Sequence, residues 1–142
     1  MNNMFAYCQD LTSLDLSNWN VSNVTDMQRM FFSCINLTDL NLSGWNAGRV
    51  TTMNQMFYDC RNLTNLNISN WNTSSVQDMS NMFTRCSNLT NLDLRHFDTS
   101  NVRNMDSMFS YCNKLTDLYL SGWDTSNVTG MSNMFFSVQT LT

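Results

Sequence analysis

The sequence predicts an α/β repeat solenoid of about 5.5 coils, in which each coil holds a short parallel strand and a short helix. Three series of residues support this fold class, because each recurs every 26 residues without an insertion or deletion. One inserted residue would break the register of every later coil, so the unbroken spacing predicts stacked units. The series are Cys8, Cys34, Cys60, Cys86 and Cys112; Trp19, Trp45, Trp71, Phe97 and Trp123; and Val24, Val50, Val76, Val102 and Val128.

The repeat makes residues 1–142 a single array. Its units are 1–10 (partial), 11–36, 37–62, 63–88, 89–114, 115–140 and 141–142 (partial). Met1-Asn-Asn-Met4-Phe5 matches Met27-Gln-Arg-Met30-Phe31, so the first methionine is in phase with the repeat. We expect either an excerpt of a longer array or end-to-end self-association, since identical faces that stack without closing a ring build a filament.

The strand of each unit is indicated by its leucines. Leu14-x-Leu16 alternates with a period of two, which is typical of a short strand with one buried face. The pattern recurs at Leu40 and Leu42, Leu66 and Ile68, Leu92 and Leu94, and Leu118 and Leu120. Because the units stack, these strands are expected to form one parallel sheet with about 4.8 Å between coils.

A short helix is expected later in each unit. In Val24-x-x-Met27-x-x-Met30-Phe31 the apolar residues are three or four apart, which places them on one helical face. Ser22 or Asn23 would cap this helix, and Asp26 would lie near its first turn. Corners at the tryptophan and at the cysteine would join the helix to the strands.

The phrase Leu-Thr-x-Leu-Asp-Leu-Ser-Asn-Trp-Asn-Val-Ser-Asn-Val-Thr-Asp-Met-x-x-Met-Phe, residues 11–31, resembles the BspA-type leucine-rich repeats of bacterial surface proteins. The resemblance covers the whole chain. It implies a leucine-rich-repeat solenoid on secreted or surface-anchored proteins, with roles in adhesion and in host or matrix binding. It implies no catalytic residues. The chain departs from the pattern at 47–49 and at Arg95, His96 and Phe97.

The composition argues against two classes of partner. The net charge is −4, whereas nucleic-acid binding requires Lys and Arg that neutralise phosphates. No apolar run reaches the length that spans a bilayer, so we expect no membrane insertion of this segment.

The five cysteines form one column, which we expect to consist of buried reduced thiols. Equivalent positions in neighbouring coils would lie about 5 Å apart, a separation that a disulfide accepts, so disulfides remain the alternative. Val138 occupies the sixth position of the column, which favours an apolar environment. No histidine or second cysteine recurs beside the column, so no metal or cofactor is expected, and the twelve methionines are better explained as core.

His96 is the single histidine, at a corner where other units carry Asn or Gly, and is expected to be exposed and incidental. The chain shows no recurring acid–base pair, no Gly-rich phosphate loop and no nucleophile motif. We therefore expect no catalytic residues and no enzyme activity.

The outward side chains of the strands form a polar strip, which is either a solvated sheet face or a concave binding face, as solenoids use. The residues are Ser13, Asp15, Asp39, Asn41, Asn65, Asn67, Asn91, Asp93, Asp117 and Tyr119.

Two further polar series have weaker interpretations. Asn-x-Ser/Thr sequons would carry glycans in a secreted eukaryotic or glycosylating host, although the composition alone generates many of them. They begin at Asn20, Asn23, Asn36, Asn41, Asn62, Asn67, Asn72, Asn88 and Asn127. The threonine file is a remote candidate for ice or mineral binding, although hydroxyls that bond along a turn explain it better. It comprises Thr12, Thr38, Thr64, Thr90 and Thr116.

The sequence therefore predicts a non-catalytic, extracellular or cell-surface protein. Near-identity of the units favours a structural stalk or fibre for surface display and adhesion. The alternative is an adhesin module that binds a host or matrix protein or a glycan on the strand face.

Overall fold

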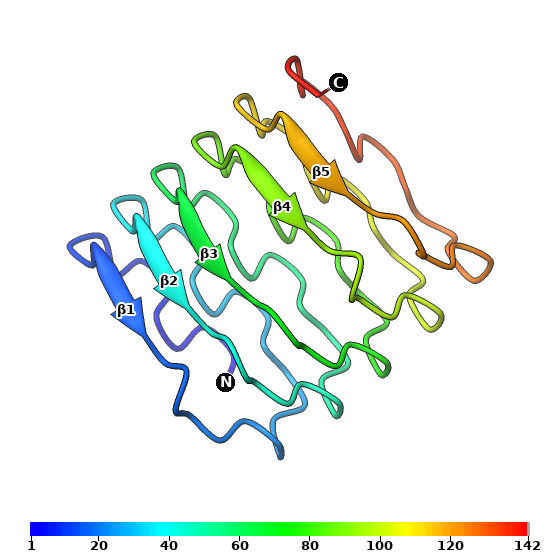
Figure 1. Ribbon diagram of the computed structural model, residues 1–142, viewed down its shortest axis with the longest axis horizontal. Helices are drawn as coiled ribbons and strands as arrows, with labels where there is room; N and C mark the ends of the chain where they lie inside the picture. Colours follow the sequence, from blue (N-terminus) through cyan, green and yellow to red (C-terminus); the bar gives the residue numbers. More distant parts are fainter. Residues whose placement is uncertain (142) are drawn as a thin grey trace.

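The computed structural model describes residues 1–141 and contains five strands of three residues each. They are β1 (Ser13–Asp15), β2 (Asp39–Asn41), β3 (Asn65–Asn67), β4 (Asn91–Asp93) and β5 (Asp117–Tyr119). Figure 1 shows the five strands in sequence order along the molecule, pointing the same way, with the termini at opposite ends. The predicted short parallel strands are thus confirmed. Thr142, in the expected partial unit 141–142, lies outside the described residues.

Paired strands are in register at the repeat length. Leu14 lies opposite Leu40, Leu40 opposite Leu66, and Leu92 opposite Leu118. A second line of parallel bridges joins Asp26, Thr52, Asp78, Asn104 and Gly130 on another side of the stack. Neighbouring units therefore contact each other along two lines of backbone, except between β3 and β4, which do not pair.

The expected helix is absent from residues 1–141, and this part of the fold prediction was wrong. Arg29 and Ser33 have φ of 53° and 55°, and a left-handed residue interrupts the run of right-handed dihedrals that an α-helix needs. The segment forms consecutive turns instead, in which Met30 N bonds Met27 O at 3.3 Å and Cys34 N bonds Phe31 O at 3.2 Å. Every unit has left-handed residues at the same two positions. They are Asn3 and Tyr7, Arg29 and Ser33, Gln55 and Asp59, Asn81 and Arg85, Ser107 and Tyr111, and Asn133 and Ser137.

Contacts with the next unit hold these turns in place. Arg29 N donates to Asn54 O at 3.0 Å, Phe31 N to Met56 O at 2.9 Å and Ser33 N to Tyr58 O at 2.8 Å. A left-handed non-glycine residue costs about 1–2 kcal/mol, and these inter-unit bonds offset that cost. Alternate amides therefore bond within the turn and to the neighbouring unit. Asp26 is not in a first helical turn, because its carboxylate accepts Gln28 N in a turn of its own.

The core consists of columns of equivalent side chains. Phe31, Phe57, Phe83 and Phe109 are each inaccessible to solvent and stack with ring centroids 5.4–5.7 Å apart. The methionines of the repeat that belong to inner units, such as Met53 and Met56, are buried beside them. Equivalent rings in the outermost units are less buried. Phe135, the counterpart of Phe109, is 44% exposed, and Trp19, the counterpart of the buried Trp45, is 39% exposed.

Three of the four tryptophan side chains also link two units by a hydrogen bond. The indole N–H groups of Trp45, Trp71 and Trp123 donate to backbone carbonyls 29 residues earlier, at 2.8, 2.9 and 2.9 Å. Phe97 has no such donor. His96 Nε2 instead donates to Ile68 O at 3.0 Å, the carbonyl that an indole at position 97 would reach.

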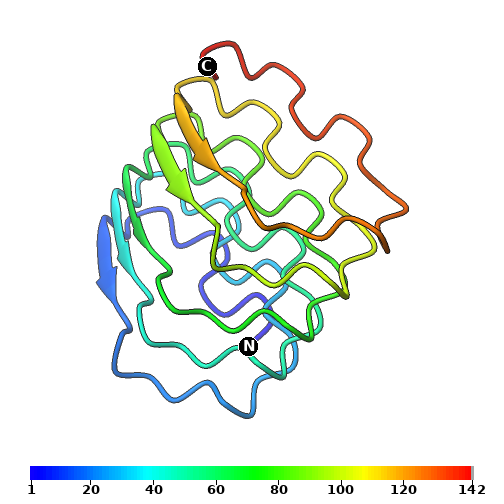
Figure 2. The same cartoon turned by 45° about the vertical axis from the view of Figure 1, so that its right-hand side comes forward.

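The strand ladder is interrupted once, so the expectation of one parallel sheet was wrong. β1, β2 and β3 form one sheet and β4 and β5 another, and every Cα of β3 is more than 8 Å from every Cα of β4. Figure 2 shows β4 and β5 as a pair set apart from β1–β3. On the opposite side the same two units stay joined, since Asn81 N bonds Asp106 O at 2.8 Å and Arg85 N bonds Ser110 O at 2.8 Å. The units are therefore splayed only on the strand side.

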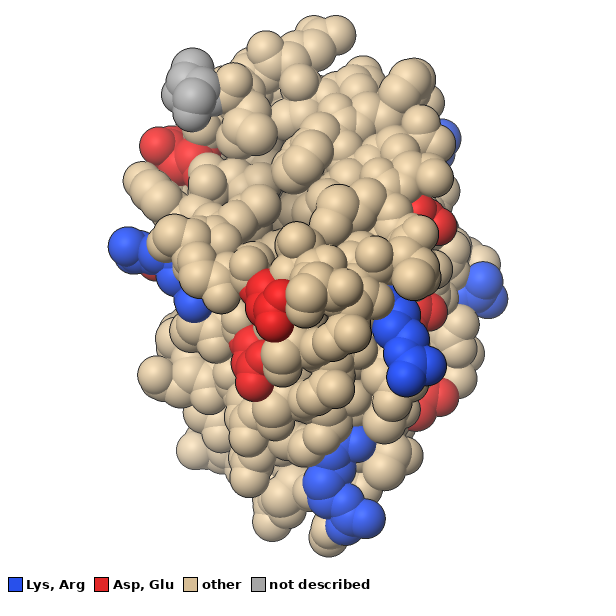
Figure 3. All heavy atoms as spheres, turned by 90° about the vertical axis from the view of Figure 1, so that its right-hand side faces the viewer, with Lys and Arg blue, Asp and Glu red and all other residues tan. Residues whose placement is uncertain are grey.

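Charged side chains are few and dispersed. On the side of the molecule seen in Figure 3, basic and acidic residues lie singly or in small groups among uncharged ones. Across residues 1–141, no helix has the length and apolar character needed to traverse a bilayer.

Candidate functional site

The strand face is hollowed by a cavity of about 540 Å³ over β1–β3. Seven of the ten predicted face residues lie around it, while Asp93, Asp117 and Tyr119 lie beyond it. Nine of the ten are exposed, and Asn41 is half-buried. The residues around the cavity are Ser13, Asp15, Asp39, Asn41, Asn65, Asn67 and Asn91.

The carboxylates on this face accept local hydrogen bonds. Ser17 N donates to Asp15 Oδ1 at 2.9 Å, and this backbone bond lowers the Asp15 pKa. The Thr38 hydroxyl, followed by the Asn65 amide, lowers the Asp39 pKa. A lowered pKa keeps each group ionised near neutral pH, so these groups accept hydrogen bonds and are unsuited to general-acid chemistry.

The β4–β5 end of the face carries a compact ionic and aromatic group. Arg95 Nη2 lies 2.6 Å from Asp93 Oδ2, and the guanidinium carbon lies 5.2 Å from the centroid of the Tyr119 ring. The Arg95 side chain lowers the Asp93 pKa to about 2. Arg and Tyr are the residue types that dominate protein-binding hot spots.

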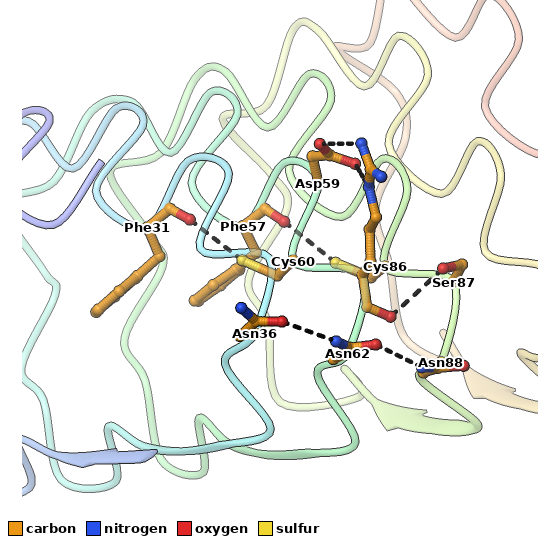
Figure 4. Close-up of polar contacts among 10 residues, drawn as sticks. Phe31, Asn36, Phe57, Asp59, Cys60, Asn62, Cys86, Ser87 and Asn88 are labelled. Carbon is orange, nitrogen blue, oxygen red and sulfur yellow. Dashed lines mark hydrogen bonds and ion pairs between the residues drawn. The ribbon is translucent and has the colours of Figure 1, made fainter. Parts of the chain in front are cut away.

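The thiol column is a structural feature of the core. Cys34, Cys60, Cys86 and Cys112 are buried, and all five cysteines are free. Cys60 Sγ donates to Phe31 O at 3.2 Å and Cys86 Sγ to Phe57 O at 3.2 Å (Figure 4). Cys8 is exposed, which corrects the expectation that the whole column is buried.

Burial also determines the protonation of these thiols. It raises the pKa of Cys34 to about 11 and of Cys112 to about 12, and it raises those of Cys60 and Cys86 well above the usual value. The thiolate is the nucleophile and the metal ligand, so the four buried groups are inert at neutral pH. Within residues 1–141, no three His, Cys, Asp or Glu side chains are grouped so as to hold a metal ion.

His96 was expected to be incidental, and its contacts show that it is not. The residue is exposed, but its imidazole supplies the bond to Ile68 O that other units obtain from tryptophan. Since a carbonyl oxygen only accepts, Nε2 carries the proton in this contact. His96 is therefore a structural substitute for an indole N–H.

The sequons divide into two groups by what their amides contact. Asn62 Nδ2 bonds Asn36 Oδ1 and Asn88 Nδ2 bonds Asn62 Oδ1, at 3.4 and 3.1 Å, in a file across the units (Figure 4). The nitrogen atoms of Asn36 and Asn127 also donate to backbone carbonyls. The remaining sequon side chains act as acceptors from neighbouring residues, and all of them except Asn41, which also contacts the Asp15 carboxylate, keep the amide nitrogen for a sugar. They are Asn20, Asn23, Asn41, Asn67 and Asn72.

The threonine file bonds to the backbone. The hydroxyl of Thr38 donates to Thr12 O at 3.0 Å, that of Thr64 to Thr38 O at 3.2 Å and that of Thr116 to Thr90 O at 3.1 Å. These hydroxyl–carbonyl bonds are of the kind that the sequence predicts as the alternative to ice binding.

Sequence reasoning missed an aromatic and basic surface on the turn side of the stack. Phe32 and Tyr58 stack at 4.8 Å, and the Arg85 guanidinium carbon lies 5.6 Å from the Tyr111 ring centroid. A hollow of about 290 Å³ lies among Tyr58, Arg85, Tyr111 and Phe136. The available signal was variation at 84–85 and 110–111 in an otherwise regular repeat.

Comparison with known proteins gives one family. The model described as "Mycoplasma protein of unknown function, DUF285" matches residues 1–91 and, again, residues 62–142. The two overlapping matches agree with the internal repeat. No curated protein matches the chain.

Proposed function

Because this chain belongs to the DUF285 family, whose function is unknown, we propose from its geometry that it is a non-catalytic structural scaffold. In this proposal the units are BspA-type leucine-rich repeats that stack into a stiff array at the cell surface or outside the cell. The array holds adhesive surfaces away from the cell.

One observation carries the proposal: each unit bonds to the next through both backbone and side chains. The strand pairs, the turn amides, the indoles and the thiols all reach a neighbouring unit. Such contacts on several sides resist bending in more than one direction. A stack of this kind is suited to providing length and stiffness.

The two end faces support continued stacking. Phe135 is 44% exposed, whereas the equivalent Phe109 is fully buried, and Trp19 is 39% exposed, whereas Trp45 is fully buried. A further unit on either face, from the same polypeptide or from another molecule, would bury these rings as inner units do. A heterologous contact of this kind propagates rather than closes.

The surface location and the leucine-rich-repeat assignment rest on the resemblance of residues 11–31 to BspA-type repeats. Polar Asn, Ser and Thr side chains over most of the surface suit a solvated array. Nucleic acid is a poor partner for a chain of net charge −4.

The test is concentration-dependent association in solution. The chain is expected to associate end to end in sedimentation velocity and to give short rods by electron microscopy. Trp19→Arg with Phe135→Arg is expected to abolish association, because each places a charge in a face that must become buried.

Tyr119→Arg is the matched control. Its side chain is 43% exposed but belongs to the strand face, so association should persist. Monomers of the unmodified chain at every concentration, or equal loss in both variants, would contradict stacking through the end faces.

A second candidate is a binding module, favoured by the 540 Å³ cavity on the strand face. Its partner would be a host or matrix protein or a glycan. Ala substitution of Asp39 and Asn65, which bond each other across the cavity, should weaken capture of such a partner and leave end-to-end association unchanged.

A further inference from the structure

A slot lies between β3 and β4 in an otherwise regular stack. Neighbouring strands of a sheet are normally about 4.8 Å apart, but every Cα–Cα separation between β3 and β4 exceeds 8 Å. Two strand spacings amount to about 9.6 Å. The separation of β3 and β4 thus exceeds that of paired strands, and a gap of two strand spacings would admit one additional strand.

The backbone groups that line the slot lack the bonds made at equivalent positions. Leu42 N bonds Asn67 O at 2.8 Å and Leu94 N bonds Tyr119 O at 3.0 Å, but Ile68 N makes no such bond to Asp93 O. These edges present donors and acceptors at the spacing of a parallel ladder.

The threonine file is broken at the same place. Thr116 bonds Thr90 O through both its amide and its hydroxyl, whereas Thr90 makes neither bond to Thr64 O. Two independent lines of contact thus stop between the same two units.

The walls of the slot have an apolar centre and polar sides. A cavity of about 240 Å³ is bounded by the apolar residues Leu66, Ile68 and Leu92 and by Asn67, Asn91 and Asp93. His96 also lines it. This order matches a strand whose central side chain points into the core and whose flanking side chains point outward.

The departures from the repeat coincide with the slot. Position 97 is Phe, and His96 rather than an indole reaches Ile68 O. Gly44, Asn70 and Gly122, which occupy the position of His96 in three other units, have left-handed φ, whereas His96 and the equivalent Asn18 of the first unit do not. The chain therefore turns differently at residues 95–97, directly after β4 and beside the slot. The turns on the other side of the stack keep their inter-unit hydrogen bonds.

We propose that this slot binds an extended polypeptide segment of another protein, which inserts as a parallel strand between β3 and β4. Main-chain hydrogen bonds to both edges would provide affinity, as in other cases of strand addition. The segment has an apolar residue at its centre. Its neighbours carry hydrogen-bond donors, such as Asn or Lys, because four strand-face carboxylates and a single guanidinium make this face acidic. Those groups are Asp15, Asp39, Asp93, Asp117 and Arg95.

This site is distinct from the proposed end-to-end stacking. It uses the sides of two inner strands, and the stacking proposal uses the first and last units. Loss of association after Trp19→Arg and Phe135→Arg therefore leaves the slot available, and each proposal fails or survives separately.

The first measurement is amide hydrogen exchange of the free protein. Ile68 and Leu42 form the matched pair, since they are equivalent residues and only the Leu42 amide bonds the next strand. The Ile68 amide is expected to exchange at least about tenfold faster than the Leu42 amide. A hydrogen-bonded amide exchanges only after its bond to the next strand has opened, whereas an amide without that bond needs no such opening. Equal protection would overturn the proposal, because it would mean that the sheet is continuous in solution.

The second measurement adds a capped peptide, Thr-Asn-Leu-Asn-Ile-Ser, the sequence of residues 64–69. Binding should slow exchange of Ile68 and Asn91. N-methylation of the peptide at its leucine removes one main-chain donor and should weaken binding about tenfold. Equal affinity of the methylated peptide, or no binding of either, would overturn main-chain recognition.

The matched protein control is the triple variant Arg95→Ser, His96→Gly and Phe97→Trp, which copies the Ser-Gly-Trp of residues 121–123. It should fold as the other units do, close the slot, protect Ile68 like Leu42 and lose the peptide. Undiminished binding to the triple variant would overturn the proposal. Protection of Ile68 by an oligosaccharide but not by the peptide would overturn it in favour of a glycan ligand.

Discussion

Replacing Trp71 by Phe tests whether the inter-unit indole bond stabilises the stack. The Trp71 ring is 2% exposed, lies 5.8 Å from the Trp45 ring and 6.3 Å from the Phe97 ring, and donates to Leu42 O at 2.9 Å. In the described chain, Leu42 O receives no second backbone or side-chain donor. Trp71→Phe therefore leaves a buried carbonyl unpaired as well as shrinking a core side chain.

The expected loss follows from these two effects. An unsatisfied buried acceptor costs about 1–3 kcal/mol, and the smaller ring removes apolar surface worth about 1–2 kcal/mol. The free energy of unfolding should fall by about 3 kcal/mol. For a chain of this length that corresponds to a decrease in Tm of about 10 °C.

Trp45→Phe is the matched comparison. Its acceptor, Leu16 O, also receives the amide of Trp19 at 2.9 Å, so it keeps a partner when the indole is removed. The loss should be about 1–2 kcal/mol, mainly from the smaller ring. Urea unfolding of both variants at equal m-value measures the difference. Equal losses, or a smaller loss for Trp71→Phe, would refute the assignment of stability to the carbonyl partner.

Three further outcomes are expected. His96→Ala should lower the free energy of unfolding by about 1 kcal/mol, while His96→Gln, which retains a donor, should restore part of it in urea unfolding. Alkylation at pH 8 followed by mass spectrometry should label Cys8 alone in the folded chain, since the buried Cys34 thiol has a pKa of about 11; labelling of all five would contradict this. The Asp93 pKa of about 2 lies below its unfolded value, so the contribution of Asp93 to stability is present above pH 4 and is lost as pH falls towards 2. Arg95→Ala should raise the Asp93 pKa, which an NMR titration measures.

Periodicity in the sequence predicted the strands, their register and most of the core. It did not predict the turns. Apolar residues three and four apart, as at Met27, Met30 and Phe31, fit a helix face, and they fit equally a ribbon of turns that buries the same side chains. Arg29 and Ser33 gave no warning, because neither is a residue type that favours left-handed φ. The bonds to the next unit decide the conformation, and these come from residues 25 positions away.

The candidate site was predictable only in part. Outward Asp and Asn residues on the strands follow from alternation, as Asp39 and Asn65 show. The departure at His96 and Phe97 was visible, but its meaning depends on a carbonyl in another unit. The slot beside β4 was not visible at all, because Asn91-Leu92-Asp93 is an ordinary strand sequence.

The bonding of each unit to its immediate neighbours has a consequence for how genes of this kind change. Since the inter-unit backbone bonds join residues about 25 or 26 positions apart, inserting 26 codons adds one set of contacts, deleting 26 codons removes one set, and the others stay intact. Recombination between repeats can thus lengthen or shorten the array without passing through a misfolded intermediate. A deletion whose length is not a multiple of 26 would place Phe57 or Trp71 opposite the wrong side chains. The protein can therefore vary in reach from one lineage to the next while its cross-section is inherited unchanged.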